Sequence, residues 1–181
     1  MSRDPPGAPR AFGWPAGLSG LGLERRPERE ADLGFLVELY ASTRREELAA
    51  AGWPAEAMDG FLRSQFDLQR HHYRTYFPAC EFDVLELHGE PIGRLYLDRQ
   101  ERSFHIIDIV LLPPWRGRGL GGAIVAALKQ AAAASGQGLS IMVEQYNPAR
   151  RLYERMGLEV VADHGVYLEM LWRPESQLKT A

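Results

Sequence analysis

Apolar residues recur along this chain with two spacings, and each spacing predicts a different kind of element. A return every three or four residues is typical of a helix with one buried face. Three stretches have that spacing: residues 28–40, 53–77 and 119–135. Alternation of apolar and polar residues, or a short apolar run, is typical of a strand. Seven stretches are of this kind: residues 21–25, 81–87, 92–98, 103–112, 139–143, 158–162 and 166–171.

A short helix is also expected between Asn147-Pro148 and Gly157. Asparagine is a good N-cap, proline suits the first helical turn, and glycine is the usual left-handed C-cap. The predicted order is strand, helix, helix, three strands, helix, strand, helix and two strands. It predicts a mixed α/β fold, with an antiparallel meander first and one strand–helix–strand crossover afterwards.

The two ends of the chain lack such patterns. Residues 1–20 contain four prolines and four glycines without an apolar period, so we expect a flexible Pro/Gly-rich arm that buries too little to become ordered. Residues 21–173 are expected to form one domain, and residues 174–181 a frayed tail.

Composition narrows the class of protein. The chain has 181 residues, 45% hydrophobic and 25% charged, which is typical of a soluble globular domain. A net charge of −3 and a pI near 6.0 argue against a nucleic-acid partner. One cysteine, Cys80, is too few for a disulfide framework or a zinc ribbon. Apolar runs fall far short of the ~20 residues that span a bilayer, and the first residues lack a secretory h-region, so we expect a cytoplasmic protein without a membrane partner.

The most informative stretch is residues 106–122, IIDIVLLPPWRGRGLGG, where an apolar strand leads into a basic, glycine-rich loop that opens a helix. N–H groups at a helix start converge on one spot and carry partial positive charge, so the loop is a candidate phosphate or pyrophosphate site. Arg116 and Arg118 can supplement it. Four glycines would let a ligand approach the backbone, or would only satisfy the geometry of a solvated turn: Gly117, Gly119, Gly121 and Gly122.

The spacing of Gly117, Gly119 and Gly122 also matches the dinucleotide-binding fingerprint, with Glu144 about 20 residues further on. Three features disfavour a nicotinamide or flavin site. Residues 113–116 separate the strand from the first glycine, a hairpin precedes the loop, and too few residues follow Glu144 for a second half of that fold. A Walker loop is excluded because no Gly-Lys-Ser/Thr follows.

Two blocks of the sequence resemble the GNAT superfamily of acyl-CoA-dependent N-acyltransferases. The first is Arg116-Gly-Arg-Gly119-Leu-Gly121, which matches the signature Arg/Gln-x-x-Gly-x-Gly/Ala at the start of the central helix. The second is Asn147-Pro-Ala-Arg-Arg-Leu-Tyr153-Glu-Arg-Met-Gly157-Leu158. The resemblance covers about residues 21–173. It implies a GNAT-type fold, with a central, mixed, mostly antiparallel sheet that is splayed between its middle strands and flanked by helices.

The resemblance also implies acetyl-CoA as co-substrate. Its pantetheine arm would thread between the strand that ends near Leu111 and the strand 139–143, its pyrophosphate would lie on the glycine loop, and a backbone N–H near Val110 or Leu111 would polarise the thioester. Asn147 would contact the cofactor, act as an N-cap, or both. The implied cofactor-binding residues are Ile109, Val110, Leu111, Arg116, Gly117, Arg118, Gly119, Leu120, Gly121, Gly122 and Asn147.

For the chemistry, the resemblance implies that Tyr153 is the general acid, because a phenol with a pKa of ~10 can protonate a departing thiolate with a pKa of ~8.5. Core packing is the alternative role for this tyrosine.

The general base stays open between Glu144, Asp108, His105 and no protein base. By the period of two, His105 and Asp108 are expected on opposite faces of their strand. Histidines and the lone cysteine lack metal-ligand spacing, so no metal is expected.

The sequence thus predicts an N-acetyltransferase that passes an acetyl group from acetyl-CoA to a primary amine by direct attack. The amine, on a small molecule or a protein, and the oligomeric state are left open. The alternative is a catalytically inactive acyl-CoA-binding module with a regulatory or interaction role, which would keep the glycine loop but would not need Tyr153.

Overall fold

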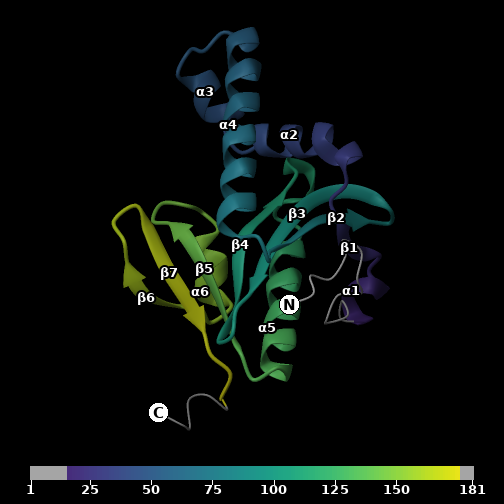
Figure 1. Cartoon of the computed structure of the whole chain (residues 1–181), viewed down its shortest axis with the longest axis vertical. Coiled ribbons are helices and arrows are strands. Elements are labelled where there is room, and N and C mark those ends of the chain that lie inside the picture. The colour runs from purple at the N-terminus through teal and green to yellow at the C-terminus, as the bar shows by residue number, and fades with distance from the viewer. Residues whose placement is uncertain (1–15, 176–181) are drawn as a thin grey trace.

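The computed structural model describes residues 16–175, and within them one sheet of seven strands runs in the order β1-β2-β3-β4-β5-β7-β6 (Figure 1). Neighbouring strands are antiparallel except β4 and β5, which are parallel. This confirms the expected mixed, mostly antiparallel sheet. The strands are β1 Leu23–Pro27, β2 Glu81–Leu87, β3 Glu90–Arg99, β4 Ser103–Leu111, β5 Gly138–Glu144, β6 Glu159–Asp163 and β7 Tyr167–Trp172.

Helices lie on both faces of the sheet. The 3-10 turns are η1 Glu30–Asp32 and η2 Pro113–Trp115, and the α-helices are α1 Ala16–Gly20, α2 Leu33–Ala41, α3 Arg45–Ala50, α4 Ala55–Tyr76, α5 Leu120–Ala134 and α6 Arg150–Arg155. On one face, Ile124 and Leu128 of α5 join the main core with strand residues such as Ile106. On the other face, Leu36 of α2 and Phe66 of α4 enclose a smaller core against β2. Figure 1 shows the first half of α4, with α3 beside it, standing clear of the sheet.

The sheet is splayed at its only parallel pair within the described residues. β4 and β5 pair over Ser103–Ile106 and Gly138–Ile141, and both strands then continue, to Leu111 and Glu144, without pairing to each other. The far side of β4 remains paired to β3 up to Leu111. The backbone N–H and C=O groups on the facing edges of the two parted strands are therefore available to hydrogen-bond another partner.

A β-bulge changes which residues of β4 share a face. His105 lies opposite Asp98 of β3 and Asp108 lies opposite Tyr96, so Ile107 is an extra residue without a counterpart. Because Asp98 and Tyr96 are two residues apart, they point to the same face, and His105 and Asp108 do so too. The expectation that His105 and Asp108 lie on opposite faces is therefore wrong.

The N-terminal boundary also differs from the expectation. Residues 16–20, the last part of the expected arm, form helix α1, and Leu18 is buried in the main core beside Leu23. One buried leucine in a five-residue helix is too little to produce an apolar period, so the pattern missed it. Residues 1–15 of the expected arm and 176–181 of the expected tail lie outside the described residues.

Helix boundaries otherwise follow the sequence patterns closely, with one addition. The short helix α3 was not expected, because its six residues bury none of their side chains and carry no apolar stripe. In the part of the chain that the structure describes, the search for a helix long and apolar enough to cross a membrane finds none.

Candidate active site

The glycine loop lies at the open end of the splay, directly before α5. Gly117 and Gly119 have φ angles of +71° and +82°, a left-handed conformation that favours glycine, and open space surrounds the position of a Cβ at each. The hydrogen-bond ladder of α5 begins with the N–H of Ala123 donating to the carbonyl of Gly119, at 3.0 Å. The N–H groups of residues 120–122 precede that ladder, so the loop has the features of an anion site.

The next two glycines serve a different contact. A Cβ on Gly121 would lie 3.2 Å from Leu152 of α6, and one on Gly122 would lie 3.7 Å from the same side chain. Their small size lets α6 pack closely on the first turn of α5. The packing of α6 thus gives Gly121 and Gly122 a structural role beside the ligand contact that the sequence predicts for them.

The two loop arginines point to different partners. Arg116 donates from Nε to the carbonyl of Leu111 at 2.7 Å and from Nη2 to Oγ of Ser42 at 2.9 Å. It thereby joins the end of β4 to the end of α2. Arg118 is exposed and its guanidinium lies over the ring of Trp115, 5.1 Å from the centroid. Both side chains are exposed, and that of Arg116 is already held by two hydrogen bonds within the chain.

Tyr153 lies in α6 with 4% of its surface exposed, within the main core. Burial raises the pKa of its phenol above the ordinary value, and the negative charge of Asp108 raises it further. Asp108 belongs to the opposite face of the sheet, so the two groups influence each other where β4 and β5 have parted. The phenol is therefore protonated at neutral pH and lies close to the splay.

Asn147 lies on the surface just before α6. Its Oδ1 accepts a hydrogen bond from the N–H of Ala149 at 2.9 Å, so its side chain caps the turn that leads into the helix. The helix ends at Arg155 and is followed by Met156 and Gly157, which has a φ of +80°, and the N–H of Leu158 donates to the carbonyl of Tyr153. The predicted left-handed cap at Gly157 is confirmed, whereas the predicted N-cap is wrong: the helix begins at Arg150 with Ala149 as its N-cap, and Asn147 caps only the preceding turn. Cofactor contact by Asn147 remains a prediction.

Asp108 is held in an ion pair. Arg94 of β3, with a side chain only 2% exposed, donates from Nε to Oδ2 of Asp108 at 2.9 Å, and its Nη2 contacts the same oxygen. Nη2 also donates to Oε1 of Gln69 in α4 at 2.7 Å. Burial alone would lower the pKa of Arg94, but the Asp108 carboxylate outweighs it and raises that pKa. Asp108 is thus the counter-ion of a buried guanidinium.

His105 lies where the strands begin to part, and its environment differs from that of Asp108. Its Nδ1 shares a hydrogen bond of 2.9 Å with Oγ of Ser140, which lies 3.3 Å from Oγ of Ser103. Burial lowers the pKa of His105 below its ordinary value of 6.5, so the imidazole is neutral at pH 7. The three side chains line an open hollow of about 1090 Å³, with Met142 and Glu169 also on its wall.

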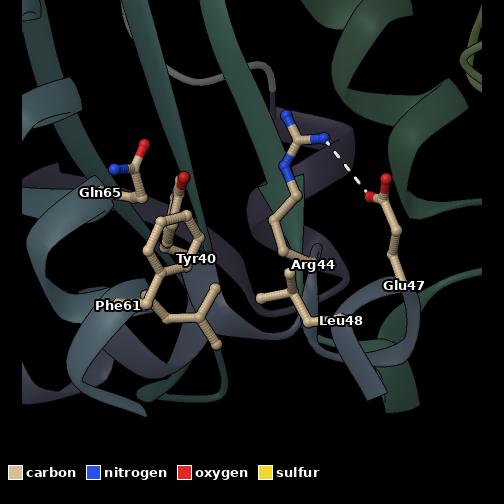
Figure 2. Close-up of a pocket in the computed structure, with 7 residues that line it drawn as sticks. Tyr40, Arg44, Glu47, Leu48, Phe61 and Gln65 are labelled. Carbon is tan, nitrogen blue, oxygen red and sulfur yellow. Dashed lines mark ion pairs between the residues drawn. The ribbon is translucent and has the colours of Figure 1, made fainter. Parts of the chain in front are cut away.

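Glu144 stands at the exposed end of β5, and its carboxylate faces Arg44. The two charged groups are 3.6 Å apart, and their side chains are 40% and 46% exposed. Arg44 also contacts Glu47 at 3.8 Å, and both line a smaller pocket of about 260 Å³ between α2, α3 and α4. Figure 2 shows this pocket, with Tyr40, Phe61 and Gln65 across from Arg44.

The structure places Asp108 and Glu144 on the parted segments of β4 and β5 and His105 in the paired segment just before them, while Tyr153 lies in α6 under the electrostatic influence of Asp108. Sequence reasoning missed Arg94, Ser140 and Arg44 as their partners. Arg94 carried one usable signal, because a charge in the middle of an apolar strand needs an opposite charge, and Asp108 stands in the next strand of the hairpin. Within the described residues, the search for a cluster of three or more His, Cys, Asp or Glu side chains able to hold a metal finds none.

Comparisons of sequence point to one family. The sequence model described as the Acetyltransferase (GNAT) family matches residues 36–158. The uncharacterized N-acetyltransferase YycN of Bacillus subtilis (strain 168) is 34% identical over 94 residues, which are 49% of this chain and 56% of that protein. The matched part thus spans about half the length of this curated relative.

Solved structures share the fold at low identity. PaiA N-acetyltransferase from Thermoplasma acidophilum, in complex with coenzyme A, has a TM-score of 0.63 and 16% identity, over 84% of this chain and 99% of that one. An acetyltransferase from Thermus thermophilus has a TM-score of 0.60 and 22% identity, over 85% and 98% of the two chains. At these identities the likeness shows the fold.

Proposed function

The chain belongs to the acetyltransferase (GNAT) family, as its two sequence blocks predicted, and we propose that it transfers an acetyl group from acetyl-CoA to a primary amine by direct attack. The observation that carries the proposal is the parting of β4 and β5 beyond Ile106 and Ile141, next to the open glycine loop. Backbone groups on a parted strand can pair with an extended ligand as with an added strand.

The residues around the splay fit the chemistry of coenzyme A. The N–H groups of residues 120–122 and the open backbone at Gly117 and Gly119 would hold the pyrophosphate, with Arg118 able to add a charge-assisted hydrogen bond. Residues 109–111 of β4 would pair with the pantetheine arm, and the N–H of Val110 or Leu111 would polarise the carbonyl. When bound, acetyl-CoA supplies the activated acetyl thioester.

Tyr153 is the proposed general acid. As the new C–N bond forms and the C–S bond breaks, its hydroxyl gives a proton to the leaving thiolate. The hydroxyl carries its proton at neutral pH as an ordinary tyrosine does. Because burial raises its pKa, the transfer would be favourable only toward a thiolate that is itself shielded from water in the site. The electrostatic influence of Asp108, which lies on the parted segment of β4, supports this role beside core packing.

His105 is the proposed acceptor of the amine's proton through bound water. Direct transfer is excluded, because Val110 lies five residues further along β4 and a strand rises about 3.3 Å per residue. The lowered pKa of His105 leaves the imidazole neutral at pH 7, and it lines the open hollow at the point where the strands part. Asp108 is less suited, because Arg94 already binds its carboxylate. Glu144 is less suited because it is exposed at the end of β5, beside Arg44. Ser140, through its hydrogen bond to Nδ1, would orient the ring.

The first test is ligand binding followed by thiol release. Acetyl-CoA or free CoA at 100 times its Kd should stabilise the protein by about 2.7 kcal/mol, a rise in Tm of roughly 5–10 °C, and NAD(P)H should not. Thiol release with a panel of spermine, kanamycin, lysine and a peptide with a free N-terminus then identifies the class of amine. A Tm shift with NAD(P)H alone would refute the proposal.

Tyr153→Phe separates the enzyme from a module that only binds CoA. The variant should release thiol about 10²-fold more slowly and keep the Kd for CoA, because phenylalanine differs from tyrosine only by the missing hydroxyl group. Unchanged turnover would remove the assigned role of Tyr153. A wild-type protein that binds CoA but releases no thiol with any amine would favour the regulatory module.

A further inference from the structure

The open hollow of about 1090 Å³ lies over β4, β5 and β7, on the face of the sheet that carries α2 and α4. In β5, Ser140 and Met142 alternate with residues of the main core, so they face the hollow. In β7, Leu171 lies opposite Ser140 and Glu169 lies opposite Met142. The volume is close to that of sites that hold a small molecule, and most of the residues on the wall are polar.

Two arginines line the closed end of the hollow, where β4 and β5 are still paired. Arg102 directly precedes β4, and Arg173 directly follows β7. The start of β5 lies between them: the N–H of Gly138 donates to the carbonyl of Arg102 at 3.1 Å, and a Cβ on Gly138 would lie 2.7 Å from the carbonyl of Trp172. The two arginine backbones are thus two strand spacings apart, about 10 Å, so both guanidinium groups can reach one small anion.

The two guanidinium groups have no counter-charge in the part of the chain that the structure describes. Both side chains are exposed, and neither forms an ion pair or a side-chain hydrogen bond with residues 16–175. The carboxylate that lines the hollow is that of Glu169, four residues before Arg173 and therefore about 13 Å away along β7. It lies 3.7 Å from Nε2 of His164. The closed end is therefore a positively charged surface, although the chain as a whole has a net charge of −3.

Coenzyme A does not account for this positive charge. Its pyrophosphate would lie on the glycine loop, beyond the end of β4 at Leu111, whereas Arg102 stands before the start of β4 at Ser103. The strand between these two ends is about 26 Å long at about 3.3 Å per residue. The acetyl end of the thioester, which would enter the splay, is uncharged. The two arginines therefore suit a different ligand, and a guanidinium pairs best with the two oxygens of a carboxylate or a phosphate.

We propose that the hollow binds a small molecule through a carboxylate or phosphate group, which Arg102 and Arg173 hold at its closed end. This anion site is separate from the coenzyme A site and goes beyond the proposed acetyl transfer. Two sources share the required chemistry. One is a separate anionic molecule that modulates the protein. The other is the amine acceptor itself, with the anionic group at its far end, and only this second identification rests on the proposed function.

Isothermal titration calorimetry on the full chain measures the anion site directly, with succinate and inorganic phosphate as probes at constant ionic strength. Arg102→Gln and Arg173→Gln should each weaken the Kd of the bound probe by about tenfold or more, because each removes a charge-assisted hydrogen bond. Both should keep the wild-type Kd for CoA. No saturable binding of either probe to wild type, or an unchanged Kd in the double variant, would overturn the proposal.

Arg63→Gln is the matched control for the loss of one positive charge. Arg63 is an exposed arginine of α4 that pairs with Asp67, and it does not line the hollow. The variant should bind succinate and phosphate with a Kd within about twofold of wild type, because charges on distant exposed groups are screened by salt. An equal loss of anion binding in Arg63→Gln and Arg102→Gln would show an effect of net charge alone and would overturn the site.

Lysine and cadaverine distinguish the two sources of the anion, since they differ by one carboxylate. If the acceptor supplies the anionic group, the KM of lysine should be about tenfold below that of cadaverine in wild type and equal to it in the double variant Arg102→Gln/Arg173→Gln. Succinate should then compete with lysine. If a separate molecule supplies it, succinate should change the rate without competing with the amine. Succinate binding in a protein that releases no thiol with any amine would uphold the anion site and refute acetyl transfer.

A second copy of the chain is the rival occupant of the hollow. Sedimentation velocity should give the same oligomeric state for wild type and for the double variant Arg102→Gln/Arg173→Gln, with and without succinate. A dimer of wild type that the double variant loses would overturn the proposal, because the hollow would then be an interface between two chains.

Discussion

Asp108→Leu should destabilise the protein markedly, because it leaves the charge of Arg94 buried without its partner. The Arg94 side chain is 2% exposed, and both its Nε and its Nη2 contact Asp108. Removing one partner of a fully buried pair costs about 3–5 kcal/mol, and the 18% exposure of Asp108 places this pair at the lower end, about 3 kcal/mol. For a domain of this size that is a fall in Tm of about 6–12 °C.

The double variant Arg94→Met/Asp108→Leu is the decisive comparison. Exchanging both partners for apolar side chains leaves no unpaired charge in the core. The free energy of unfolding of the double variant should therefore return to within about 1 kcal/mol of wild type. Arg94→Met alone should lose stability at pH 7, and this loss should shrink as the pH falls to 5, because a carboxyl group can take up a proton. Asp108→Leu should keep its loss, since a guanidinium cannot lose its charge in this range.

Urea unfolding followed by circular dichroism at pH 7 and pH 5 measures these free energies. The reasoning would be refuted by an Asp108→Leu variant within about 1 kcal/mol of wild type, or by a double variant no more stable than the single one. The same variants bear on catalysis. If Asp108 serves only as a counter-ion, the stable double variant should retain a pH–rate profile with the wild-type shape.

Three further outcomes follow from single residues. Folding holds His105 neutral below its ordinary pKa of 6.5, so kcat/KM and stability should both fall as the pH drops below 6.5, and His105→Gln should abolish that limb of the rate profile. Burial raises the pKa of the Cys80 thiol, so Ellman's reagent should react with it only after unfolding. Gly93→Ala should unfold the protein, because its Cβ would lie 2.3 Å from the carbonyl of Val110, whereas Gly60→Ala in open space on α4 should stabilise it by about 0.5–1 kcal/mol in urea titrations.

Much of the fold was predictable because its elements are encoded locally. The central helix begins directly after Gly119, and the short helix α6 is closed by Gly157 two residues beyond its end; such signals depend on a few adjacent residues. The glycine loop was predicted in the same way, whereas the role of Tyr153 was implied only by the family resemblance, and both remain predictions. Helices α1 and α3 were missed because each is too short for a period, and their positions depend on what they contact.

The partners of the site residues were not predictable from local pattern. Arg94 and Asp108 meet across a hairpin, and Arg116 reaches Ser42 over 74 positions of sequence. The candidate bases cannot be ranked until these long-range contacts are known, because each contact decides whether a carboxylate is free or bound.

By itself the sequence determined the order of the strands along the chain, the open loop before α5 and the family to which those features belong. Only the tertiary structure decided that His105 and Asp108 share a face, because the bulge at Ile107 exists through the register of β4 against β3. The period of two holds within one strand only while every residue has a counterpart. A bulge breaks that period, and the neighbouring strand, not the local sequence, sets its position.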